Sequence, residues 1–156
     1  MSSMIETVTG SSDGLAAAAQ LLHDFNLEYD EPSPPPDELA GRLAGLIETD
    51  QVVVLVARTE GEPVGVAAMR VQPSLWSDAS EAYVAELYVV PDRRGQGFGR
   101  ELITEAVSVA RDRGAEYAFL ITSEDDRLAQ RLYEAAGFRR TEGEGGPLML
   151  AYEQDL

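Results

Sequence analysis

The sequence predicts one domain of the α/β class, of the α+β type, in which seven strands and four helices follow one another as β-α-α-β-β-β-α-β-α-β-β. Apolar residues switch between helical and strand spacing along the chain, and this switching gives the order of elements. The 156 residues suit one domain with an ordinary core, and no segment recurs at a fixed period. We therefore expect residues 1–156 to form a single unit.

The first half of the chain is predicted to hold a strand, two amphipathic helices and a hairpin. In the first helix Leu15, Ala19 and Leu22 recur at helical spacing, and Pro36 suits the opening position of the second. The turn TEGE separates two β-rich runs. In chain order we expect a strand in 4–9, a helix in 11–25, an acidic proline-rich connector in 26–35, a helix from 36, and strands in 51–58 and 63–71.

The second half contains the clearest strand, loop and helix. Residues 81–90 are apolar at both odd and even positions, as expected for a strand covered on both faces. Pro91 ends the hydrogen-bond ladder of this strand. A helix is predicted over 99–113, with Gly114 as its C-cap. We expect in turn a loop in 72–80, a strand in 116–122, a helix in 125–136 capped by Gly137, and two strands around a glycine-rich turn in 138–153.

The composition excludes several classes of function. With no cysteine there is no disulfide framework, thiolate nucleophile or cysteine-rich metal site. All twelve basic residues are arginine, and the absence of lysine excludes a Schiff-base enzyme and a GxxxxGK phosphate loop. The net charge of −16 argues against nucleic acid or an anionic membrane as partner and favours a cationic one, or adaptation for solubility. Lacking a signal-like or membrane-spanning stretch, the chain is expected to be cytoplasmic.

The stretch PDRRGQGFGRE, residues 91–101, concentrates positive charge in this acidic chain. Three glycines and three arginines surround a predicted helix start, where free amides and the positive end of the helix dipole attract anions. The spacing G-x-G-x-G differs from the dinucleotide-binding fingerprint, which argues against a nicotinamide site. Such a loop is therefore either a tight turn solvated by arginines or a diphosphate site, and its position after a buried strand favours the second.

The segment ELYVVPDRRGQGFGRELI, followed about thirty residues later by RLYEAAGF, resembles the acetyl-CoA signature of the GCN5-related N-acetyltransferase (GNAT) superfamily. The R-x-x-G-x-G pattern of that signature is matched by Arg94, Gly97 and Gly99. The resemblance implies a mixed, mostly antiparallel sheet of six to seven strands flanked by about four helices. It also implies acetyl-CoA as acyl donor, no metal, and a reaction in which an amine attacks the thioester. Dimers are frequent in this family, so a homodimer stays open.

The resemblance also implies which residues bind coenzyme A. In this family the strand diverges from its neighbour after a bulge and opens a slot for the cofactor. Main-chain groups of the strand pair with the pantetheine arm as an added strand would, and the amide of Val89 polarises the thioester carbonyl. The implied contacts are the backbone of Leu87, Tyr88 and Val89 with the pantetheine, and the loop residues Arg94, Gly95, Gln96, Gly97, Phe98, Gly99 and Arg100 with the pyrophosphate.

Glu86 is the candidate general base. An alkylamine has a pKa of about 10, so on the order of one molecule in a thousand is free base at pH 7 and proton removal needs help. Glu86 is the one charged side chain inside AYVAELYVV, where it is predicted to share a face with Val84, Tyr88 and Val90. Partial desolvation would raise its pKa and suit it to accept a proton, directly or through water. The alternative is a structural carboxylate paired with an arginine.

Tyr133 is the candidate general acid for the departing thiolate, since a phenol has a pKa of about 10. Its position off the apolar stripe of the last helix lets its hydroxyl reach a site, although a tyrosine at the edge of the core is the alternative. Ala129 and Tyr133 match the family pattern N-x-x-A-x-x-x-Y. Asp126 replaces the asparagine of that pattern, and we expect it to cap the helix.

The acceptor is the least defined part of the prediction. The acid-rich residues 24–38 suit a small cationic amine, or form an ordinary solvated loop. Trp76 could cover the acceptor or plug its loop against the sheet, and His23 is expected to be structural. The function predicted is acetyl transfer to a primary amine of a small molecule. A protein or peptide N-acetyltransferase and a non-catalytic acyl-CoA sensor are the alternatives.

Overall fold

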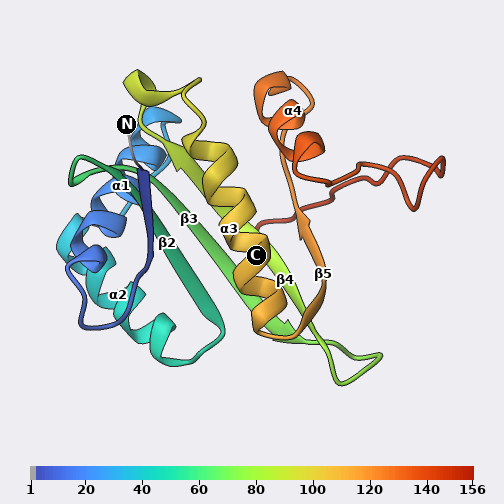
Figure 1. The fold of residues 1–156 in the computed structure, drawn as a ribbon, viewed down its shortest axis with the longest axis horizontal. Helices are drawn as coiled ribbons and strands as arrows, with labels where there is room; N and C mark the ends of the chain where they lie inside the picture. The colour runs from blue at the N-terminus through green and yellow to red at the C-terminus, as the bar shows by residue number, and fades with distance from the viewer. Residues whose placement is uncertain (1–2) are drawn as a thin grey trace.

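The computed structural model describes residues 3–156 and shows a five-stranded sheet with helices on both faces (Figure 1). A short 3₁₀ turn, Pro91–Arg93, links β4 to the loop before α3. The elements are β1 Ser3–Thr7, α1 Gly14–Glu28, α2 Pro36–Glu48, β2 Val52–Thr59, β3 Glu62–Pro73, β4 Ser80–Val89, α3 Phe98–Asp112, β5 Ala115–Leu120 and α4 Arg127–Ala135.

The strands lie in the sheet in chain order, β1-β2-β3-β4-β5. The first four pair antiparallel: β2, β3 and β4 follow one another through a turn and a loop, whereas α1 and α2 lie between β1 and β2. Strand β5 runs parallel to β4, with α3 crossing over between them. This confirms a mixed, mostly antiparallel sheet. The predicted four helices are also present, each within a few residues of its expected bounds.

The prediction of six to seven strands is wrong for the described residues, because the C-terminal segment does not form two strands. Residues 141 and 148 make one isolated bridge, supported by bonds from Glu142 N to Pro147 O and from Met149 N to Arg140 O, both 2.9 Å. A two-stranded ribbon needs a third strand or a helix to pack against, and every residue from 147 to 156 is exposed. The segment therefore stays a loose hairpin with an extended end.

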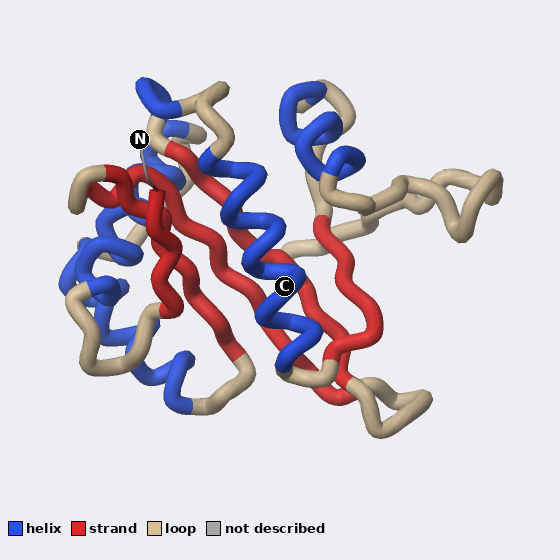
Figure 2. Tube along the Cα trace, in the orientation of Figure 1, coloured by secondary structure: helices blue, strands red, loops and turns tan. Residues whose placement is uncertain are grey.

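Two cores lie on opposite faces of the sheet, and Figure 2 shows the helices that cover them. The apolar face of α3, including Phe98, Leu102 and Ile103, packs on one face. Helices α1 and α2 cover the other through residues such as Ala18 and Leu43. The run Val53–Ala57 in β2 is buried throughout because both of its faces are covered.

Helix α3 lies close to β3 because residue 65 is glycine. A Cβ there would stand 2.8 Å from Cδ1 of Leu102. This close approach fixes the start of α3 against the second half of β4, and so positions the glycine loop. No helix within residues 3–156 is both long and apolar enough to cross a membrane.

Candidate active site

Strands β4 and β5 diverge partway along their length. They are paired only from Ser80 to Val84 of β4, and the ladder ends where Val84 meets Leu120. Immediately after this point β4 carries a bulge: its register against β3 passes from Met69–Val84 to Ala68–Glu86, which leaves Ala85 as the extra residue. The second half of β4 therefore borders an opening in the sheet, which we call the β4–β5 slot.

The backbone of β4 offers hydrogen-bonding groups to this slot. The amide of Val90 donates to Val64 O in β3 at 2.9 Å, so by the alternation of an antiparallel ladder the main-chain groups of Tyr88 also face β3. Those of Leu87 and Val89 then face the slot. Nε of Arg94 donates to Val89 O at 2.9 Å, which agrees with this direction. The expectation that Tyr88 offers its main chain to a ligand is therefore corrected.

The glycine loop leaves a run of amides free at the start of α3. Gly95 and Gly97 adopt left-handed conformations, with φ of 77° and 95°, and the buried ring of Phe98 anchors the loop to the core. Among residues 3–156, no backbone carbonyl accepts a hydrogen bond from the amides of 95–100. Together with the dipole of a 15-residue helix, these amides make the loop an anion site.

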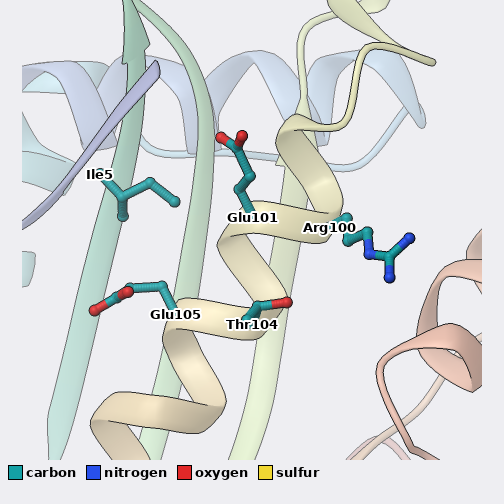
Figure 3. A pocket seen from close by; sticks show the side chains of 5 residues that line it. All are labelled: Ile5, Arg100, Glu101, Thr104 and Glu105. Carbon is teal, nitrogen blue, oxygen red and sulfur yellow. The ribbon is translucent and has the colours of Figure 1, made fainter. Parts of the chain in front are cut away.

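The three arginines near the loop take different directions. Nη2 of Arg94 donates to both carboxylate oxygens of Glu28 in α1 at 2.9 Å, and Nη2 of Arg93 lies 3.4 Å from Glu62. Arg100 remains exposed. In Figure 3 its guanidinium points away from the acidic side chains of Glu101 and Glu105. Arg94, which was expected at the pyrophosphate, is thus paired with Glu28. Arg100 is the arginine whose guanidinium points away from the neighbouring carboxylates.

One hollow in the described surface lies away from the slot. It is open, has a volume of about 500 Å³, and lies between β1 and α3, lined by Ile5, Arg100, Glu101, Thr104 and Glu105 (Figure 3). Its floor is α3 rather than the slot, and two carboxylates border it. The β4–β5 slot is the candidate active site, because main-chain groups of β4 face it without a partner strand.

Glu86 faces the side of the sheet covered by α1 and α2, next to Tyr88. The bulge puts Val84 on the opposite face, in the α3 core, so the prediction that Val84 and Glu86 share a face is wrong. Glu86 is an exposed residue of β4, yet partial desolvation of its carboxyl raises its pKa above the ordinary 4.5, against the lowering effect of Arg70. No arginine within the described chain lies within 4.0 Å of it, so the alternative of an ion-paired carboxylate is not observed.

Tyr133 is half-buried on the α3 side of the sheet, edge to face with Phe138 at 6.3 Å between ring centroids. Burial raises the pKa of its phenol to about 12, and the charge of Asp126 adds to the shift. Asp126 accepts a hydrogen bond from Ala129 N at 3.1 Å, which confirms it as the cap of α4. Glu86 and Tyr133 thus belong to opposite faces of the sheet.

Comparison with known proteins identifies the family. The sequence pattern of the Acetyltransferase (GNAT) family matches residues 18–138. The chain belongs to the GNAT family. It is therefore an acetyltransferase, and the fold that the resemblance implied is confirmed apart from the missing C-terminal strands.

Three relatives of this GNAT protein illustrate the match. The chain is 30% identical to the uncharacterized N-acetyltransferase YhfO of Bacillus subtilis over 82% of its own length and 85% of that protein. It is 34% identical to the thialysine N-epsilon-acetyltransferase of Bos taurus, over 69% and 68%. A crystal structure from Arthrobacter sp. FB24, named as an acetyltransferase, superposes with a TM-score of 0.86 at 38% identity, covering 98% of this chain and 96% of the other.

One cluster of this GNAT protein was missed by sequence reasoning. On the face that carries Glu86, the ring of Tyr88 stacks on Phe25 of α1 at 5.0 Å, and its hydroxyl donates to Glu28 at 3.3 Å. The guanidinium of Arg94 lies over the same ring, 5.6 Å from its centroid. Burial, then Glu28, raises the pKa of the Tyr88 phenol. The acidic run from residue 24 indicated this region of the chain. Nothing in the sequence indicated that Glu28 would pair with Arg94, because the two are 66 positions apart.

The other side chains considered for the acceptor site of the GNAT protein are not part of this cluster. Trp76 is 92% exposed and lies in the β3–β4 loop, at the end of β4 remote from Glu86. It neither covers the slot nor plugs its loop. Nδ1 of His23 lies 3.0 Å from Ser33 Oγ and from Pro34 O, which ties the connector to α1, and this contact agrees with its predicted structural role.

Proposed function

We propose that this protein transfers the acetyl group of acetyl-CoA to a primary amine of a small, cationic molecule. The observation that carries the proposal is the combination of the β4–β5 slot with the run of free amides at residues 95–100. The β4–β5 slot suits the extended pantetheine arm of coenzyme A, which carries amide groups. The free amides at residues 95–100 suit the diphosphate of coenzyme A.

The residues present fit this donor. The backbone of Leu87 and Val89 would pair with the pantetheine arm, and the amides of 95–100, with Arg100 beside them, would bind the pyrophosphate. Acetyl-CoA supplies the activated thioester. The free amide of Val89 faces the slot, where it would stabilise negative charge on the carbonyl oxygen under attack.

Glu86 would remove a proton from the amine on the α1–α2 face. A carboxyl group with a raised pKa accepts a proton more readily than an ordinary surface glutamate, and the exposure of Glu86 permits transfer directly or through water. No arginine competes for its oxygens within the described chain. The amine would therefore approach the slot from this face.

Tyr133 would donate a proton to the departing thiolate from the other face. With a pKa of about 12 the phenol keeps its proton at every pH at which the protein would work. A coenzyme thiol has a pKa in the ordinary range for thiols, above about 8, so the phenol of Tyr133 is the weaker acid, and the transfer needs a hydrogen bond that positions the phenol against the developing thiolate. The two proton transfers are thus separated by the sheet.

Acidic residues support a cationic acceptor. The negative charges of Glu28 and Asp24 both raise the pKa of Tyr88, which lies next to Glu86. The whole chain has a net charge of −16. The bovine relative is named for acetylating an amine nitrogen of thialysine. A small amine carrying a second positive charge would be attracted to this face.

The test is a thiol-release screen with acetyl-CoA against polyamines, aminoglycosides, diamino acids and peptides. Because the chain has no cysteine, a thiol reagent detects coenzyme A alone. Calorimetry with coenzyme A is run beside it. Release with a small diamine supports the proposal, and release with peptides alone points to a protein N-acetyltransferase. Tight binding with no release for any amine points to an acyl-CoA sensor, and no binding at all refutes the donor site.

A further inference from the structure

An arginine lies next to Glu86 on the same face of the sheet. Arg70 is two residues along β3 from Ala68, the register partner of Glu86, so the two side chains start about 7 Å apart along the strands. The residues on either side of Arg70 belong to the core under α3, so Arg70 points to the opposite face, as Glu86 does. An acceptor amine at Glu86 would therefore have an exposed guanidinium nearby.

The charge of Arg70 is available to a ligand. Within residues 3–156 no carboxylate lies within 4.0 Å of its guanidinium. Glu81, on the same face of β4, accepts a hydrogen bond from Gln72 at 2.9 Å instead. Burial raises the pKa of the Glu86 carboxyl and the charge of Arg70 lowers it, so the field of this guanidinium reaches the candidate base. An arginine without an acid in a chain of 28 acidic residues suits an anionic group of a ligand.

Two aromatic rings, Tyr83 and Phe119, adjoin Arg70; we call them the aromatic pair. Tyr83 is the register partner of Arg70, and its ring stacks on that of Phe119 in β5 at 4.9 Å between centroids. The two residues face each other one position before the β4–β5 ladder ends, so the pair borders the slot. Both are half-buried, and neither belongs to the two cores of the described chain. The pair thus offers an apolar surface between the slot and Arg70.

We propose that Arg70 binds a carboxylate of the acceptor and selects a diamino acid, whose side-chain amine lies at Glu86. This inference rests on the acetyl-transfer function proposed above and names its substrate class. The guanidinium would donate hydrogen bonds to the carboxylate, and the methylene groups between carboxylate and amine would lie on the aromatic pair. The separation of Glu86 and Arg70 leaves room for several such groups.

The charge of the whole chain favours a carboxylate over a more highly charged anion. A diamino acid carries two ammonium groups and one carboxylate, so it keeps a net positive charge at neutral pH. Such a molecule is still attracted by a chain of net charge −16. A phosphate-bearing amine would lose that attraction. Arg70 therefore distinguishes a diamino acid from a simple diamine without reversing the preference for cations.

The first test compares lysine with cadaverine, which is the same molecule without the carboxylate. We expect the wild type to have the higher kcat/KM for lysine. Arg70→Gln should lower that value about 10-fold to 100-fold, mainly through KM, and leave the value for cadaverine unchanged or higher. Any effect of Arg70 on Glu86 is common to both amines and cancels in their ratio. Arg70→Lys should restore part of the preference because it keeps the charge. An unchanged ratio in Arg70→Gln overturns the proposal.

The second test measures binding without turnover, by calorimetry of lysine in the presence of coenzyme A. The dissociation constant should weaken about 10-fold or more in Arg70→Gln. Arg42→Gln is the matched control, because Arg42 pairs with Glu38 on exposed α2, and it should leave binding unchanged. If no amine releases thiol but Arg70→Gln still weakens lysine binding, acetyl transfer is refuted and the carboxylate site stands. If the wild type binds lysine no better than cadaverine, Arg70 does not select the acceptor.

Discussion

Arg94 and Glu28 form an ion pair that joins the glycine loop to α1, in which the single nitrogen Nη2 of Arg94 lies 2.9 Å from both oxygens of Glu28. The same arginine bonds through Nε to Val89 O, the carbonyl that faces the β4–β5 slot. Arg94 therefore occupies a group that the proposed pantetheine arm would use, and Glu28 holds it there.

Glu28→Gln should strengthen the binding of coenzyme A. Without the carboxylate, Arg94 loses its charged partner and is free to move from Val89 O towards the anion. A partly exposed ion pair of this kind contributes up to about 1 kcal/mol, which corresponds to a gain in affinity of about fivefold. Calorimetry measures it, with Glu38→Gln as control because Glu38 pairs with Arg42 on exposed α2. Unchanged affinity would show that Glu28 does not restrain the loop.

Glu86→Gln should lower kcat by about 100-fold to 10,000-fold at neutral pH, with little change in the KM for acetyl-CoA. The wild-type rate should rise with pH through the raised pKa of Glu86, above 4.5, and this acidic limb should disappear in the variant. Glu81→Gln is the control, since Glu81 lies on β4 and accepts a bond from Gln72. A full rate in Glu86→Gln would remove Glu86 from the mechanism.

The same substitution should stabilise the fold. Because the pKa of Glu86 is raised in the folded state, its contribution to stability is present below pH 4.5 and is lost as pH rises through the folded value. At pH 7 the folded protein thus carries an unfavourable carboxylate that Glu86→Gln removes. Because Glu86 is exposed, solvent screening limits the gain to a Tm about 1 to 3 °C higher, shrinking towards zero at pH 4. Thermal unfolding at the two pH values measures it, and a Tm that falls at pH 7 contradicts it.

Tyr133→Phe should lower kcat about 100-fold and leave the fold intact, because the ring that packs on Phe138 is kept. The wild-type rate should show no loss from ionisation of Tyr133 up to about pH 10, since its pKa is about 12. Stopped-flow detection of thiol release measures the rate, with Tyr117→Phe as control on exposed β5. If the rate in Tyr133→Phe equals that of the wild type, the thiolate leaves without a proton from Tyr133.

The sequence predicted the elements whose signals are local and failed where partners are distant. The buried strand, the glycine turn and the helix around residue 98 each depend on neighbours within a few positions, and all three are present. The bulge at Ala85 is invisible in the pattern of β4, because it depends on the register of β3. It is this bulge that separates Val84 from Glu86.

The C-terminal segment shows a second limit. Its alternation predicts two strands, but this prediction is wrong, because within the described residues the segment pairs with no strand of the sheet and makes one isolated bridge. The pair of Glu28 and Arg94 shows a third, since the two residues are 66 positions apart and meet only when α1 packs on the sheet. The sequence shows that Glu28 is an anion and Arg94 a cation, but it does not show that they pair.

Gly97→Ala should impair the loop, whereas Gly99→Ala should be tolerated by the fold. No atom lies within 4 Å of a Cβ built at Gly97, but its φ of 95° is costly for any residue with a Cβ, so we expect a loss of about 1 to 2 kcal/mol in the free energy of unfolding. Gly99 is not left-handed, and its Cβ would meet Leu132 at an ordinary 3.5 Å. Denaturant unfolding measures both, and calorimetry with coenzyme A should show weaker binding for Gly97→Ala. Equal stability of the two variants would mean that the loop relaxes without needing the left-handed turn, and that glycine at 97 serves only the close approach of an anion.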